Sequence, residues 1–185
     1  MTRSHEINNI TRECIVQAFL TLLRSQNYKE ITIGKIMLKA GYDRSTFYRY
    51  FKSKEEIARQ YYLDILYSGA KRYELPSERR EVTAAGVLPG FQLAMEKREE
   101  FLLLNQAGMT TQLFYALNQF YQELCPPENI EEEYSLHFRI GGLYNVADHW
   151  ISNGMTVSPE EMSELYIYAV HSLTSFGCKN RGTDC

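Results

Sequence analysis

Residues 32–57 read TIGKIMLKAGYDRSTFYRYFKSKEEI, and this stretch decides the fold. Its first apolar residues repeat at helical spacing, which predicts a short helix with one apolar face. Gly41 is expected to end that helix, as glycine does where the chain turns into the left-handed region. Asp43 is expected to cap a second short helix through its carboxylate. Two short helices across a glycine turn make a helix-turn-helix, whose second helix can enter the major groove of DNA.

The second helix separates its side chains into two sets. The aromatic side chains that are expected to face inward are Phe47, Tyr50 and Phe51. The side chains that are expected to face outward are Arg44, Ser45, Tyr48 and Arg49. Arginine can make two hydrogen bonds to guanine, and serine can hydrogen-bond to the edges of several different bases. Ser53 and Glu56 then form a capping box that predicts the start of the next helix.

The distribution of charge supports a DNA-binding role for this stretch. The net charge of the whole chain is −3, which on its own disfavours a nucleic-acid partner. Residues 1–60, however, contain eleven Lys or Arg and six Asp or Glu, a net charge of +5, whereas residues 61–185 contain nine and seventeen, a net charge of −8. Attraction for phosphate is therefore concentrated where the helix-turn-helix lies.

The stretch 32–57 resembles the DNA-binding signature of the tetracycline-repressor (TetR) family of bacterial transcription regulators. The matching features are Thr32 at the start of the first helix, Ala40-Gly41 in the turn, Thr46-Phe47-Tyr48, Tyr50-Phe51 and the run Lys52-Ser53-Lys54-Glu55-Glu56. Family members usually have a small residue where this chain has Tyr42, and they often have histidine where it has Tyr50. The resemblance covers roughly residues 8–66 and is much looser beyond them.

The resemblance implies a role for each matching position. The start of the recognition helix, with Arg44 and Ser45, carries the base contacts, and Thr32 is chiefly a cap whose first-turn amides meet a phosphate. Other matching positions hold phosphates and fix orientation without reading sequence. The predicted DNA-binding residues are Thr32, Arg44, Ser45, Thr46, Tyr48, Arg49, Tyr50 and Lys54.

Periodicity along the rest of the chain predicts an all-α protein with two parts. A three-helix DNA-binding domain is expected over residues 1–52, beginning with a helix over about residues 7–25. Residues 53–185 are expected to form a helical regulatory and dimerisation domain that begins with a connecting helix over residues 53–70. A linker is expected over residues 71–80, with a helix starting near Ser77. Later helices are expected over residues 82–105 (kinked or broken at Pro89-Gly90), 110–124, 129–153, and from Ser158 onward.

The last two helices predict a dimer. Two consecutive long amphipathic helices suit a four-helix bundle made with a second copy, and adjacent glycines let another helix approach closely. Residues 138–169 also resemble the C-terminal regulatory domain of some TetR-family members. The predicted interface residues are Gly141, Gly142, Leu165, Tyr168 and Ser172.

Large apolar side chains in the second part are candidates for a ligand cavity. Ordinary core packing is the competing interpretation for each of them, and the expectation of a cavity rests mainly on the family resemblance. The candidates are Phe91, Met95, Phe101, Phe114, Leu117, Phe138, Tyr144 and Trp150, with His137 and Asn145 as polar anchors.

Other classes of protein find little support. The four histidines form no metal-ligand pattern, and neither a GxSxG motif nor a glycine-rich phosphate loop is present, so no enzyme, metal site or cofactor is expected. Cys14, Cys125, Cys178 and Cys185 show no CxxC spacing, and Cys14 is expected to pack in the core. The N-terminus has no signal-peptide core, and no apolar run is long enough to cross a bilayer, so a cytoplasmic protein without membrane contact is expected.

The resemblance implies a repressor that binds a palindromic operator as a homodimer and is released by a small-molecule effector. An activator or coactivator partner can be built on the same fold. A helical interaction module without specific DNA binding is a third interpretation, which the basic recognition helix disfavours.

Overall fold

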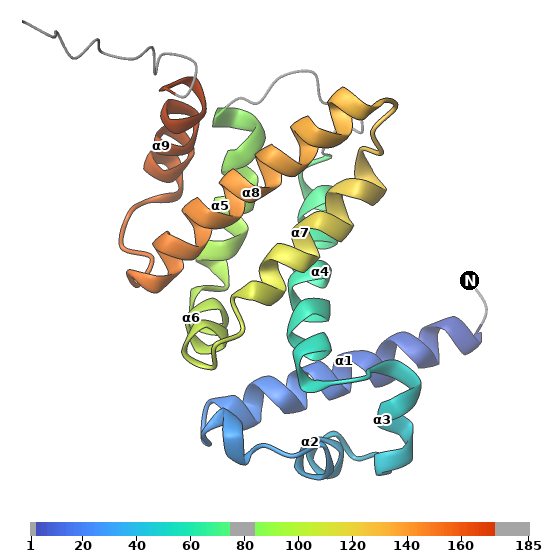
Figure 1. The fold of residues 1–185 in the computed structure, drawn as a ribbon. Helices are drawn as coiled ribbons and strands as arrows, with labels where there is room; N and C mark the ends of the chain where they lie inside the picture. The colour runs from blue at the N-terminus through green and yellow to red at the C-terminus, as the bar shows by residue number, and fades with distance from the viewer. Residues whose placement is uncertain (1–2, 75–83, 173–185) are drawn as a thin grey trace, which may run out of the picture.

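The computed structural model describes residues 3–74 and 84–172, and this part of the chain is entirely helical, as the sequence predicts. The helices are α1 (Arg3–Leu23), α2 (Ile33–Ala40), α3 (Arg44–Tyr50), α4 (Lys54–Arg72), α5 (Ala84–Glu96), α6 (Arg98–Gln106), α7 (Thr111–Leu124), α8 (Ile130–Ser152) and α9 (Pro159–Ser172), with a 3-10 turn, η1 (Tyr28–Glu30), after α1. Helices α1–α3 form a head, α5–α9 form a body, and α4 runs from one to the other (Figure 1). The predicted helix start near Ser77 lies outside the described residues.

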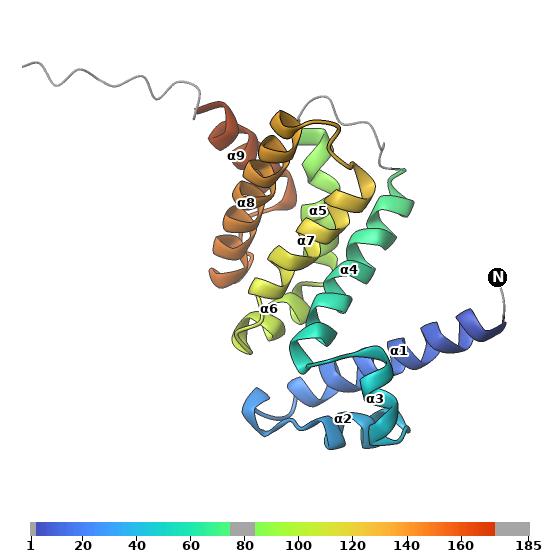
Figure 2. The same cartoon turned by 45° about the vertical axis from the view of Figure 1, so that its right-hand side comes forward.

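The head is held together by one apolar cluster. Helix α1 contributes Ile15 and Phe19, α2 contributes Ile36, and α3 contributes Phe47, and all four side chains are fully buried. Each such side chain stabilises the fold by about 1.5–3 kcal/mol relative to an exposed position. The cluster therefore fixes α3 against α1 and α2 at the edge of the molecule (Figure 2).

Local signals define the ends of the head helices. The hydroxyl of Thr32 accepts a hydrogen bond from the amide of Lys35 at 3.2 Å, and Gly41 ends α2 with φ +79°. Ser53 caps α4 by accepting from the amide of Glu56 at 3.4 Å. The prediction for Asp43 was wrong in one respect. It occupies the N-cap position of α3, but its carboxylate makes no capping bond, and its backbone carbonyl accepts from the amide of Thr46 at 2.9 Å instead.

The body is a layered bundle in which α4 packs against α7, α5 against α9, and α7 against α8. In both views α4 and α9 lie on opposite sides of this bundle (Figures 1 and 2). Helix α9 begins as predicted, because the hydroxyl of Ser158 accepts from the amide of Glu161 at 3.2 Å. Gly154, with φ +79°, lies in the turn between α8 and α9.

The sequence predicts a kink or a break at Pro89-Gly90, and the helix does not break there. Helix α5 continues through both residues, and the chain breaks instead at Lys97, where φ is −109° and ψ is 26°. A proline inside a helix costs about 3 kcal/mol through one lost hydrogen bond and a steric clash. Val87 before the proline and Phe91 after it are both buried, and their burial is comparable in magnitude to that cost. The buried face therefore keeps α5 continuous.

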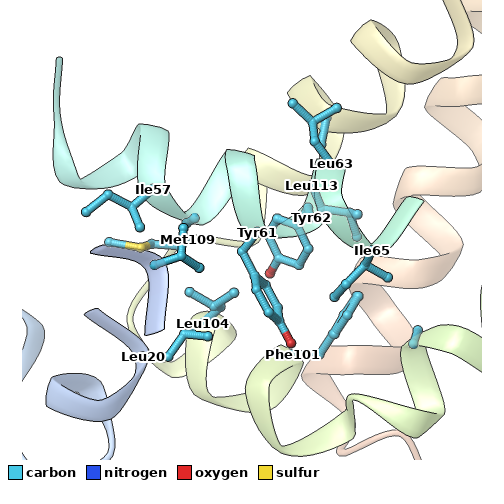
Figure 3. Close-up of a cluster of buried hydrophobic side chains, with 14 of the residues drawn as sticks. Leu20, Ile57, Tyr61, Tyr62, Leu63, Ile65, Phe101, Leu104, Met109 and Leu113 are labelled. Atoms are coloured by element: carbon cyan, nitrogen blue, oxygen red, sulfur yellow. The ribbon is translucent and has the colours of Figure 1, made fainter. Parts of the chain in front are cut away.

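The head contacts the body through α4 and α6. Leu20 of α1, Ile57 of α4, Leu104 of α6 and the following Met109 are buried together at this junction (Figure 3). Beside them, the guanidinium of Arg24 lies 2.9 Å from the carboxylate of Glu99 and 2.8 Å from that of Glu100. The ion pairs are partly exposed and contribute little stability one by one. The buried apolar side chains therefore stabilise the contact between head and body, and the Arg24 ion pairs help to set the orientation of α1 relative to α6.

Candidate nucleic-acid interface and body cavity

Helix α3 presents a polar, basic face to solvent. Arg44, Ser45, Tyr48 and Arg49 are exposed, while Phe47 and Phe51 are buried. The ring of Phe47 meets that of Tyr48 edge-on at a centroid distance of 5.4 Å, which positions the exposed tyrosine. Thr46 and Tyr50 are half-buried. The outward face of this short helix therefore contains both arginines predicted for DNA contact.

Helix α2 adds cations that the sequence prediction missed. Lys35 and Lys39 are exposed, and so is Lys29 in the preceding turn. Leu38 on the same helix is 83% exposed, which is unusual for a leucine. Apolar side chains in DNA interfaces contact the methyl group of thymine. The three lysines within residues 29–39 were the feature of the sequence from which this basic surface could have been predicted.

The hydroxyl of Thr32 already has a structural role as a helix cap. Its hydroxyl is engaged by the amide of Lys35, so it closes the first turn of α2. The other first-turn amides of α2 have no partner within the helix, as at every helix start, and such amides can bind an anion. A phosphate at this position would therefore meet backbone N–H groups and not the Thr32 hydroxyl.

Lys54 has intramolecular partners. Its ammonium donates to the carbonyl of Ile31 at 2.6 Å and to that of Tyr28 at 3.2 Å, and lies 4.0 Å from the centroid of the Tyr28 ring. The phenol of Tyr28 donates to the carboxylate of Glu55, and burial together with this bond raises the pKa of Tyr28 above its ordinary value. These contacts of Lys54 and Glu55 hold the first turn of α4 against η1. An ammonium has three donors, so one remains for the predicted phosphate contact.

We expect Lys54→Met to lower the free energy of unfolding by about 1–3 kcal/mol, because two carbonyls lose a charged donor. The measurement is chemical denaturation followed by circular dichroism. If Lys54 also holds a phosphate, the slope of log K against log salt should fall by about one unit. Lys52→Met is a matched control, since Lys52 is exposed. If Lys54→Met were as stable as the wild type, the bonds of Lys54 to Tyr28 and Ile31 would not stabilise the head.

The guanidinium of Arg12 on α1 lies 3.4 Å from the carboxylate of Asp64 on α4. Its Nε is buried without a hydrogen-bond partner among the described residues. Burial raises the pKa of Asp64, and the nearby Gln60 and Arg12 oppose that shift. Arg12 therefore joins α1 to α4.

A cavity of about 80 Å³ lies in the body between α4, α5, α7 and α8. Four of the predicted residues line it: Phe91, Phe101, Leu117 and Trp150. Tyr62, Ile65, Leu113, Phe120, Leu143 and Ala147 are among the lining residues that the prediction missed. The spacing of Leu143, Ala147, Trp150 and Ile151 along α8 is the helical stripe that could have revealed them.

Six predicted cavity residues lie outside the lining: Met95, Phe114, His137, Phe138, Tyr144 and Asn145. His137 and Phe138 are exposed. Tyr144 packs edge-on against Phe114 at a centroid distance of 5.3 Å. The amide of Asn145 donates to the carbonyl of Gly141 at 2.7 Å, so it is used within its own helix.

The outer faces of α8 and α9 carry exposed apolar side chains. Phe138 is 61% exposed and Tyr168 is 73% exposed, and the exposed face also includes Tyr134 and Leu165. A Cβ at Gly141 would meet nothing within 4 Å, and one at Gly142 would meet only Tyr166 Cε2 at 4.0 Å. Of the predicted interface residues, Ser172 is half-buried and donates to the carbonyl of Ala169. The protomer itself therefore gives no steric reason for either glycine.

Residues 3–74 and 84–172 contain no group of three or more His, Cys, Asp or Glu that is suited to a metal ion. No helix in these ranges is long and apolar enough to cross a membrane. Cys14 and Cys125 are free thiols and half-buried, so Cys14 belongs to the core only in part. Cys178 and Cys185 lie outside the described residues.

Residues 15–61, which contain the helix-turn-helix, match the family described as "Bacterial regulatory proteins, tetR family". Forty-eight residues are 42% identical to the "HTH-type dhaKLM operon transcriptional activator DhaS" of Lactococcus lactis subsp. lactis (strain IL1403). That match covers 26% of this chain and 26% of the relative, so it spans about a quarter of the relative's length.

Two solved structures share the fold over most of the chain. The "Dihydroxyacetone kinase operon activator DhaS" superposes with a TM-score of 0.50 and 18% identity, covering 89% of this chain and 96% of the other. The fatty acid degradation regulator FadR from Bacillus halodurans superposes with a TM-score of 0.51 and 15% identity, covering 92% and 97%. These likenesses support the helical fold of the chain. Residues 15–61 match the DNA-binding region of the tetR family of bacterial regulatory proteins.

Proposed function

We propose that the protein is a DNA-binding transcriptional regulator that binds a palindromic operator as a homodimer and responds to a small molecule bound in its body. The observation that carries this proposal is the outward face of α3, where Arg44, Ser45, Tyr48 and Arg49 are exposed over a buried aromatic base. Such a helix suits the major groove. Arg44 and Ser45 would read base edges, and Thr46, Tyr48, Tyr50 and Lys54 would hold phosphates.

The dimer is proposed from the exposed face of α8 and α9. Glycine inside a helix costs about 0.5–1 kcal/mol relative to alanine, and α8 contains two in succession. Neither is required within the protomer, so close approach by a second copy of α8 accounts for them best. Exposed Phe138, Leu165 and Tyr168 would then be buried. A two-fold dimer places two heads on successive major grooves, roughly 34–36 Å apart or a multiple of that distance.

Regulation is proposed to run from the cavity to the head through α4 and α6. On α6, Phe101 lines the cavity while Glu99 and Glu100 pair with Arg24 of the head. A ligand that binds better when the heads are wrongly spaced for the operator would release the protein, with a coupling of about 1–3 kcal/mol. Operator DNA must then weaken ligand binding by the same factor.

The direction of regulation has two candidates. Release from an operator by ligand is the behaviour of a repressor. The relative that matches residues of the head is described as an activator, so an activator with the same head is the second candidate. A reporter gene placed behind the operator, with and without the protein, distinguishes them. Lower expression with the protein supports a repressor, and higher expression supports an activator.

We expect Arg44→Ala to weaken binding to the operator by about 1–3 kcal/mol and to relax the sequence preference at one base position. The measurement is a gel-shift titration with DNA from upstream of the protein's own gene, in parallel with random DNA of equal length. Arg72→Ala is a matched control, because Arg72 lies at the far end of α4 and pairs with Glu96. Equal weakening on both DNAs would make Arg44 a phosphate contact. Failure of the wild type to prefer any DNA would favour an interaction module.

A further inference from the structure

The cavity lining contains no charged side chain among the described residues. It is formed by aliphatic and aromatic groups, with Phe91, Phe101, Phe120 and Trp150 as the largest apolar members. An isolated charge would be strongly disfavoured here, because nothing in the lining replaces its hydration. Apolar cavities of this kind also hold water poorly and accept small apolar molecules. The lining therefore favours an uncharged ligand.

Among the described residues that line the cavity, one has a buried side-chain hydrogen-bonding group without a partner. The indole N–H of Trp150 is already used, since it donates to the carbonyl of Val157 at 3.0 Å. Tyr62 also lines the cavity, and its hydroxyl is completely buried with no hydrogen-bond partner among the described residues. Buried polar groups in proteins are nearly always bonded, so this exception calls for an explanation.

Tyr62 is well placed to recognise a ligand. It lies on α4, and its ring meets that of Phe101 edge-on at a centroid distance of 5.1 Å (Figure 3). Burial raises the pKa of Tyr62 above its ordinary value, so the hydroxyl keeps its proton and acts as a donor. The missing partner is therefore an acceptor.

We propose that the cavity binds a compact, uncharged and mostly apolar molecule that offers one hydrogen-bond acceptor, such as a ketone oxygen, to the hydroxyl of Tyr62. This deepens the proposed function by naming the class of effector. The contact would join the ligand to α4, the helix whose first turn is fastened to the head.

The test uses three compounds of similar size: cyclohexanone, methylcyclohexane and cyclopentanecarboxylate. Binding is followed by the fluorescence of Trp150, which lines the cavity and is the one tryptophan of the chain. We expect cyclohexanone to bind about tenfold more tightly than methylcyclohexane, the size of one net hydrogen bond. The carboxylate should leave the fluorescence unchanged at the same concentrations.

Three variants locate the contact. Tyr62→Phe should remove the preference for the ketone while methylcyclohexane still binds. Tyr61→Phe is the matched control, since Tyr61 is the neighbouring buried tyrosine and does not line the cavity, and it should keep the preference. Ala147→Leu should weaken both neutral compounds by filling the cavity. Tighter binding of the carboxylate, a ketone preference that survives in Tyr62→Phe, or no response to any compound would overturn the inference.

The assay contains no DNA, so it can fail independently of the proposed function. If cyclohexanone binds through Tyr62 but does not change operator affinity, the ligand class stands and ligand control of DNA binding fails. If the protein binds its operator but none of the neutral compounds, the regulator stands and the ligand class is wrong.

Discussion

Phe47→Ala is expected to abolish operator binding and to lower the free energy of unfolding by about 3–5 kcal/mol. Phe47 is fully buried between the helices of the head, and its ring lies 5.9 Å from that of Phe51. Truncation leaves a cavity beneath α3, so the recognition helix loses the contacts that hold it against α1 and α2. Denaturation followed by circular dichroism measures the stability, and a gel shift measures the DNA binding.

The neighbouring tyrosine separates stability from recognition. Tyr48 is 57% exposed, so Tyr48→Ala should change the free energy of unfolding by no more than about 0.5 kcal/mol. It should still weaken binding to all DNA sequences if Tyr48 holds a phosphate. Near-wild-type stability in Phe47→Ala would mean that the head does not depend on this aromatic contact.

Gly141→Leu is expected to convert the proposed dimer into a monomer and to weaken operator binding by about 10²- to 10⁴-fold, because two linked heads bind far more tightly than one. The protomer should stay folded, since a Cβ at this position meets nothing and leucine favours a helix by almost 1 kcal/mol over glycine. Analytical ultracentrifugation measures the assembly, and thermal unfolding of the variant monitors the protomer.

The matched control is Gly90→Leu, another glycine inside a helix whose Cβ would meet nothing within 4 Å. It lies on α5, which carries none of the proposed interface residues, so the proposed dimer should persist. A monomeric wild type at working concentration would remove the proposed interface. A dimeric Gly141→Leu would move the interface to another face of the body.

Local signals in the sequence predicted the head well. Gly41 does adopt a left-handed conformation, Thr32 and Ser53 do cap their helices, and Phe47 does face inward. Each of these features depends on groups within a few residues, so a single sequence contains the cause. The TetR-family assignment rests on the same stretch and is supported by the match over residues 15–61.

The cavity was predicted less well, because its lining depends on how helices are rotated against one another. His137 and Phe138 were expected inside, yet the stripe that α8 turns inward contains Leu143, Ala147 and Trp150. The continuity of α5 through Pro89 also depends on partners that are distant in sequence. Lys54 illustrates the same limit, since its bonds to Tyr28 and Ile31 cross more than twenty residues.

The junction between head and body uses different side chains from those that line the cavity. On α4, Ile57 contacts the junction and Ile65 lines the cavity two turns later, and on α6 the same division separates Leu104 from Phe101. If the cavity is the effector site that we propose, substitutions in its lining should change ligand preference while the packing of the head against the body is preserved. For protein engineering, ligand preference could then be changed without changing the proposed operator.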